Sequence, residues 1–282
     1  MRTRAATDTL EARIAGLTLD RAGWPAPARA DALARLAAMG MPGRRDEYWR
    51  YTDPSALNAP EAAPAAQLDA GDEFAGIDAL RLVFVDGVLD LAQSDDPVMA
   101  GVEIEPLAVA GRADIHWARE VYGRLEARGQ TPVARPFAAL NTAFATDGVL
   151  VRVTGRAARP ISLVYLRGSM VSDVVLHHCV KIEARAAVTL LESGPAAARA
   201  CMVMEVDVAA GGALHHVRVQ GRDHERRAVT HLFARLDTGA QVKSFTLTAN
   251  GRLTRNEAVV DLAGEGASAH LAGAAVGDGA FH

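Results

Sequence analysis

The chain has 282 residues, a formal net charge of −4 and 50% hydrophobic residues. This length can bury a core in one large domain or in two modest ones. Arginines and acidic residues are interleaved, so there is no basic stripe and nucleic-acid binding is not expected. No apolar run approaches the roughly 20 residues that span a bilayer, and the N-terminus lacks the apolar stretch of a secretory signal. We therefore expect a soluble, cytoplasmic protein.

The first 147 residues combine helical patterns with one hairpin signal. Apolar residues at helical spacing predict two short helices within the first forty residues, and residues 59–72 are typical of a linker rich in Ala, Pro and Asp. Asp86-Gly87 between two apolar runs predicts a hairpin. Further helices are predicted over residues 112–128 and 136–145. We interpret residues 1–147 as a helical and mixed N-terminal region.

An aromatic and charged cluster occupies residues 44–52, in a chain with only 5% aromatic residues. Its aromatic members are Tyr48, Trp49 and Tyr51. Trp, Tyr and Arg dominate binding hot spots, so the cluster could be a partner-binding patch. The competing interpretation is an anchor that packs the N-terminal region onto the rest of the protein. We favour packing, because Trp is seldom left exposed.

After Asp147-Gly148 the sequence becomes a succession of short Val- and Leu-rich runs with turn residues between them, typical of an all-β architecture. The runs cover 149–153, 161–166, 173–182, 187–192, 201–208, 213–219, 228–236, 240–247, 257–262 and 269–276. No helical pattern separates them, which excludes βαβ units and leaves a sandwich, a barrel or a stacked β-helix. Recurrent small residues at the turns favour the stacked form, with strands of about five residues. We interpret residues 148–282 as one β-domain.

Two cysteines and nine histidines are the candidate metal ligands. Cys179 and Cys201 lie far apart with no CxxC partner, and we interpret both as small core residues. His177-His178 and His215-His216 are adjacent pairs, and a strand sends the two members of each pair to opposite faces. His178 and His216 could stack on neighbouring coils, and an iron-binding role for His178, His215 or His216 remains an open alternative.

No catalytic motif is found, since a phosphate loop, a nucleophile elbow and an HExxH helix are all missing from the sequence. We therefore predict no catalytic, cofactor-binding or metal-site residue and no enzyme activity. With no ligand set of three or more apparent, the isolated chain should bind iron or zinc weakly or not at all.

Several segments together resemble a known family. Residues 45–52 resemble the E-x-W-[KR]-Y-T motif near the start of SufD proteins. Phe137-x-x-Leu140-Asn141, followed by Asp147-Gly148 and a strand, resembles their entry into the β-domain. Further resemblances lie at 160–163, 178–192, 203–220, 255–257 and 264–267, so that the resemblance spans residues 40–282.

The resemblance implies a right-handed parallel β-helix preceded by a helical N-terminal region. It also implies a scaffold subunit of iron–sulfur cluster assembly that joins a SufB-like subunit and a SufC-like ATPase. No intrinsic cofactor is expected, and iron or an Fe–S cluster would be present only transiently in the complex.

The sequence departs from the family after Gly273–Gly279, which resembles the middle of the family's β-helix. We expect the chain to lack the family's C-terminal part, which carries the ATPase-docking surface and the site near SufB, and we carry over no residue of that site. An uncapped final coil should then pair with a second copy through strands near residues 256–276, giving a homodimer.

One enzyme class is the alternative to a scaffold. Histidines in an all-β domain suggest a metal-dependent cupin-type β-barrel, but a cupin needs an HxH pair on one strand face. The chain has HH pairs, and more strand runs than one jelly roll uses.

Overall fold

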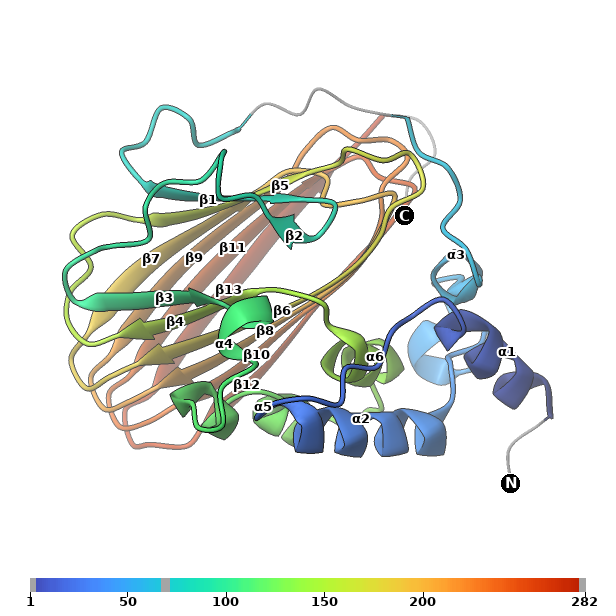
Figure 1. Ribbon diagram of the computed structural model, residues 1–282, viewed down its shortest axis with the longest axis horizontal. Coiled ribbons are helices and arrows are strands. Elements are labelled where there is room, and N and C mark those ends of the chain that lie inside the picture. The colour runs from blue at the N-terminus through green and yellow to red at the C-terminus, as the bar shows by residue number, and fades with distance from the viewer. Residues whose placement is uncertain (1–3, 67–71, 279–282) are drawn as a thin grey trace.

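The computed structural model describes residues 4–66 and 72–278, and it places two facing β-sheets beside a group of helices (Figure 1). The seven-stranded sheet has the order β13-β11-β9-β7-β5-β1-β2, and the six-stranded sheet has the order β12-β10-β8-β6-β4-β3. The strands are β1 (Leu80–Val85), β2 (Val88–Leu89), β3 (Val102–Pro106), β4 (Val149–Val153), β5 (Ile161–Leu166), β6 (Asp173–Ile182), β7 (Ala187–Ser193), β8 (Arg199–Val208), β9 (Ala213–Gln220), β10 (Arg227–Leu236), β11 (Gln241–Ala249), β12 (Leu253–Leu262) and β13 (Ser268–Val276).

From β4 onward the chain alternates between the two sheets, and each strand pairs in parallel with the strand one coil later. Asp173 pairs with Arg199, Arg199 with Arg227, and Arg227 with Leu253, so one coil takes 26 to 28 residues. The fold is a β-solenoid of about five turns, which confirms the predicted parallel β-helix. The strands are longer than expected: β6 to β13 have 7 to 10 residues each. The parallel register also rules out the jelly roll of the cupin alternative.

Strands from the N-terminal region extend both sheets. β1 pairs in parallel with β5, and β3 pairs antiparallel with β4. The hairpin predicted from Asp86-Gly87 joins β1 to β2, and both residues have the positive φ that a two-residue turn requires, 47° and 81°. The first strands of the sheets thus come from before residue 148, the start of the β-domain expected from the sequence.

Helices cover the outer face of the six-stranded sheet (Figure 1). They are α1 (Arg4–Ile14), α2 (Ala26–Met39), η1 (Glu47–Trp49), α3 (Ser55–Asn58), α4 (Leu107–Ala110), η2 (Trp117–Glu120), α5 (Arg124–Arg128) and α6 (Pro136–Phe144). The single helix predicted over 112–128 is wrong: η2 and α5 are separated there, and Gly123 between them adopts φ 70°, which an α-helix does not allow. No helix among the described residues is long and apolar enough to cross a membrane.

The two largest hydrophobic cores among the described residues result from this arrangement. One fills the space between the sheets with inward-facing residues such as Leu176, Val206 and Leu214. The other lies between the six-stranded sheet and the helices, and includes Leu36 and Trp49. Strands such as β8 are therefore buried on both faces, which explains their nearly continuous apolar sequence.

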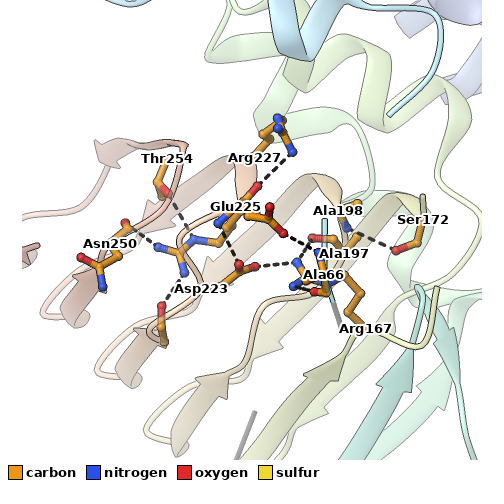
Figure 2. Close-up of polar contacts among 12 residues, drawn as sticks. Ala66, Arg167, Ser172, Ala197, Ala198, Asp223, Glu225, Arg227, Asn250 and Thr254 are labelled. Atoms are coloured by element: carbon orange, nitrogen blue, oxygen red, sulfur yellow. Dashed lines mark hydrogen bonds and ion pairs between the residues drawn. The ribbon is translucent and has the colours of Figure 1, made fainter. Parts of the chain in front are cut away.

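Arginines tie the segment after α3 to one edge of the β-helix. We call residues 59–66 the strap. Arg199 donates from Nη1 to the Ala59 carbonyl at 2.5 Å. Arg167 donates to the Ala66 carbonyl, as Figure 2 shows. Arg167 also pairs with Asp223 at 2.5 Å, and both of these side chains are buried. The strap thus crosses the turns that lead from the seven-stranded sheet into the six-stranded sheet.

Candidate functional site

The interior of the β-helix changes from apolar to polar in its later coils. Inward-facing positions of β6 and β8 carry mainly Val, Leu, Ala and Met. The inward-facing positions of β7 and β9 include Glu192, His216 and Arg218, and β10 and β12 add Thr230 and Asn256. Leu214, His216 and Arg218 alternate along the sequence and so share one strand face, and this face points into the β-helix. We call this group the interior polar cluster.

A buried ion pair forms the centre of the cluster. Arg218 Nε lies 2.5 Å from Glu192 Oε2, and its Nη2 lies 3.3 Å from Oε1. Arg218 Nη1 also donates to Thr230 Oγ1 at 2.9 Å. Burial alone would raise the pKa of Glu192, but the charge and hydrogen bonds of Arg218, together with a contribution from His216, outweigh burial and hold that pKa well below its ordinary value. Both groups therefore stay charged inside the β-helix.

A hydrogen-bonded amide pair continues the cluster toward β12. Thr230 Oγ1 donates to Asn256 Oδ1 at 2.7 Å, and Gln220 Nε2 donates to the same oxygen at 3.1 Å. Asn256 Nδ2 donates back to Gln220 Oε1 at 2.9 Å. This network borders a cavity of about 390 Å³, whose lining includes His216 and Ser244. The cavity is large enough for water or a small polar ligand.

His216 is a member of the cluster with an unused nitrogen. Its Nδ1 lies 2.8 Å from Ser244 Oγ. Its Nε2 is 3.6 Å from Glu192 Oε1, longer than a hydrogen bond, and has no partner among the described residues. His216 thus offers a buried lone pair or N–H group beside the ion pair.

His178 lies on the opposite wall of the interior, toward the first coils. The Val149 amide donates to His178 Nδ1 at 3.0 Å, so a neutral ring carries its proton on Nε2, which lies 3.1 Å from Tyr165 Oη. Burial lowers the pKa of His178 to about 4. The alternative in which His178 stacks on His216 is wrong, because His178 pairs with Met204 in β8 whereas His216 belongs to the other sheet.

The outer face of the six-stranded sheet brings three potential metal ligands together. Ligand atoms of His177, Cys179 and Glu205 lie within 4.8 Å of one another, and all three residues are buried. No set of three ligands was predicted from the sequence, because Glu205 joins the other two only through the register of β8 against β6. The prediction that no three ligands lie together is therefore wrong for these side chains.

Hydrogen bonds already occupy this trio. His177 Nδ1 lies 3.0 Å from Asn141 Oδ1, and its Nε2 lies 2.8 Å from Glu205 Oε2. The Glu126 amide donates to Glu205 Oε1 at 2.8 Å, and the Gly123 amide donates to Oε2. A metal would have to displace these bonds. Burial also raises the pKa of the Cys179 thiol, which disfavours the thiolate that metals bind.

The trio therefore fits a structural tie between the sheet and the loop that leads into α5 better than a metal site. His215, the remaining histidine singled out from the sequence, is exposed on the outer face of β9. Cys201 is buried against α6, where its Sγ lies 3.2 Å from the Phe137 carbonyl.

The aromatic cluster of residues 44–52 divides into a buried and an exposed part. Trp49 is buried, its ring lies 5.3 Å from that of Phe137, and the Arg255 guanidinium lies 4.2 Å above it. Tyr51 is 82% exposed. Packing of the N-terminal region onto β12 is thus confirmed for Trp49 and does not apply to Tyr51.

The comparisons with known proteins concern the later coils. Residues 166–282 match the family model described as SUF system FeS cluster assembly, SufBD core domain. This range contains β6 to β13 and all five residues of the interior polar cluster. A search of curated proteins gives no match.

Proposed function

We propose that the chain is a member of the SufB/SufD family and a scaffold subunit of the iron–sulfur cluster assembly complex, because residues 166–282 match the SufBD core domain. Its partners would be a SufB-like subunit and a SufC-like ATPase. The observation that carries the proposal is the coincidence of the matched range with the parallel coils β6 to β13.

A scaffold role without catalysis agrees with the burial of the two cysteine thiols. Both cysteines are buried, and burial is the main cause that raises the pKa of each thiol, to about 12 for Cys201. Neither thiol is therefore prepared to attack a substrate or to hold iron in the isolated chain. We propose that iron or a cluster is handled only at surfaces completed by partner subunits.

The test is co-expression of the chain, carrying an affinity tag, with SufB-like and SufC-like proteins from the same source. We expect the three to co-purify and to elute as one complex in size-exclusion chromatography with light scattering. A second readout is recovery of Fe–S enzyme activity in a bacterial strain that lacks its own SufD. Elution of the chain by itself, as a monomer or as a homodimer, together with failure to restore that activity, would contradict the proposal.

A further inference from the structure

A cleft rich in arginine lies on the helical side of the molecule, away from the interior polar cluster. Its volume is about 1020 Å³, and it is bounded by α2, by the η2–α5 segment, and by Asp207 and Arg235 of the six-stranded sheet. Five of its sixteen lining residues are arginines, although Lys and Arg together make up only 30 of the 282 residues. We call it the arginine cleft.

Most of the acidic groups in and beneath the cleft already have partners. Arg35 pairs with the buried Glu126, and Arg235 lies 3.3 Å from Asp207. Glu120 accepts a hydrogen bond from Lys181 at 2.9 Å. Of the lining carboxylates, only Asp31 has no ion pair within the described parts of the chain.

Three arginines of the cleft remain without a counter-charge. Arg119 in η2 and both Arg124 and Arg128 in α5 are exposed, and their guanidinium groups make no hydrogen bond or ion pair with any described residue. Arg124 and Arg128 are four residues apart on one helix, a spacing at which like charges repel. No ion pair with a described residue offsets this repulsion, so an anion in the cleft would relieve it.

The chemistry of the guanidinium group indicates the class of anion. Its planar fork binds phosphate oxygens in a bidentate manner, and three such forks match more oxygens than one phosphate offers. The volume is that of a site for a small organic ligand, and Ile115, which is 87% exposed, gives the lining an apolar side chain. We propose that the arginine cleft binds a ligand with two linked phosphate groups. This inference does not depend on the proposed role in cluster assembly.

The test is calorimetric titration of the full chain at low ionic strength with inorganic pyrophosphate, orthophosphate and ADP. We expect pyrophosphate to bind at least tenfold more tightly than orthophosphate, and binding to weaken as salt is added. The double variant Arg119→Gln/Arg124→Gln should lose at least tenfold in affinity. Arg252→Gln is the matched control, since Arg252 is an exposed arginine outside the cleft with no ion pair of its own among the described residues.

The ADP arm separates the two sources of such a ligand. Equal affinity for ADP and pyrophosphate means that the cleft contacts only the phosphate groups. If ADP binds more tightly and Ile115→Ser abolishes that difference, the cleft also contacts the organic part of the ligand. Circular dichroism establishes that each variant is folded. The proposal is overturned if pyrophosphate shows no saturable binding at millimolar concentration, or if Arg252→Gln weakens binding as much as the cleft variants do.

Discussion

At the scale of single residues, the Glu192–Arg218 pair is the least expected feature of a β-helix interior. Desolvating two charges costs several kcal/mol per ion, which only good geometry and further hydrogen bonds can offset. The two contacts between the side chains and the bond to Thr230 supply that geometry. The free energy of unfolding should therefore fall much more when one of the two charged side chains is replaced than when both are replaced.

The first prediction follows from this asymmetry. Glu192→Leu leaves the Arg218 charge buried without a counter-ion and should lower the free energy of unfolding by about 3–5 kcal/mol. The double variant Glu192→Leu/Arg218→Met removes both charges and should recover most of that loss. Urea unfolding followed by circular dichroism measures both changes. A double variant as unstable as the single variant would show that the two charges are not coupled.

The second prediction concerns His178 and pH. Its folded-state pKa of about 4 lies below the ordinary histidine value of about 6.5. Between these two values the unfolded chain binds a proton that the folded chain does not, so stability is lost as the pH falls from 6.5 to 4. The loss attributable to this group is about 3 kcal/mol. In His178→Gln, the free energy of unfolding should fall by about 3 kcal/mol less over this pH range than it does in the unchanged protein. An unchanged slope in urea unfolding at pH 7, 6, 5 and 4.5 would refute the assignment.

At the scale of the elements, glycines decide how closely neighbouring coils approach. Gly194 follows β7 with φ 106°, and a Cβ there would lie 2.0 Å from the Tyr165 carbonyl oxygen of the preceding coil. Gly211 has φ 68°, but a Cβ there meets nothing closer than Arg185 Cγ at 3.6 Å. The two glycines share an unusual backbone and differ in the space around them.

The third prediction uses these glycines as a matched pair. Gly211→Ala should cost about 1–2 kcal/mol for its left-handed backbone alone. Gly194→Ala adds a clash with the neighbouring backbone and should cost about 3 kcal/mol or more. Thermal and urea unfolding provide the comparison. Equal losses for the two variants would mean that the coils can move apart at no measurable cost.

The β-strands were predictable from the sequence, but the contacts between them were not. Alternation within each run identifies which side chains share a face, as for Leu214, His216 and Arg218. The meeting of Glu192 with Arg218 depends on the pairing of β7 with β9, one coil apart, and this register has no local signature. The same holds for Glu205 and His177, which belong to different coils. Short helices were harder to predict because a single Gly123 in the left-handed region divides a segment with an otherwise helical pattern.

At the scale of the whole molecule, the strap connects the helical region to the edge of the β-helix. Arg199 makes most of the hydrogen bonds to this segment, since its side chain donates to carbonyl groups of α3 and the strap. It also pairs with Asp173 at 2.7 Å. Arg13 of α1 also pairs with Asp173, at 3.0 Å. One carboxylate of β6 thus orients two arginines that both donate to carbonyl groups of α3.

The last prediction is that loss of the Arg199 hydrogen bonds lets the strap detach locally while the coils stay folded. Met in place of Arg199 keeps the aliphatic stem but removes the hydrogen bonds that Arg199 donates to the carbonyls of residues 59–61. A segment held by few apolar contacts then opens with a smaller free energy than the whole protein. A Glu-specific protease should cleave after Glu61 at least tenfold faster in Arg199→Met. In Arg222→Met, which changes an exposed arginine of the β9–β10 turn that forms no hydrogen bond or ion pair with the described residues 59–66, the rate should stay the same. Mass spectrometry of the fragments measures the rate of cleavage after Glu61, and circular dichroism establishes that the β-domain is intact. Equal cleavage rates in the two variants would mean that apolar packing of the strap, through Ala62 and Ala65 against Ala198, holds it in place without the arginine.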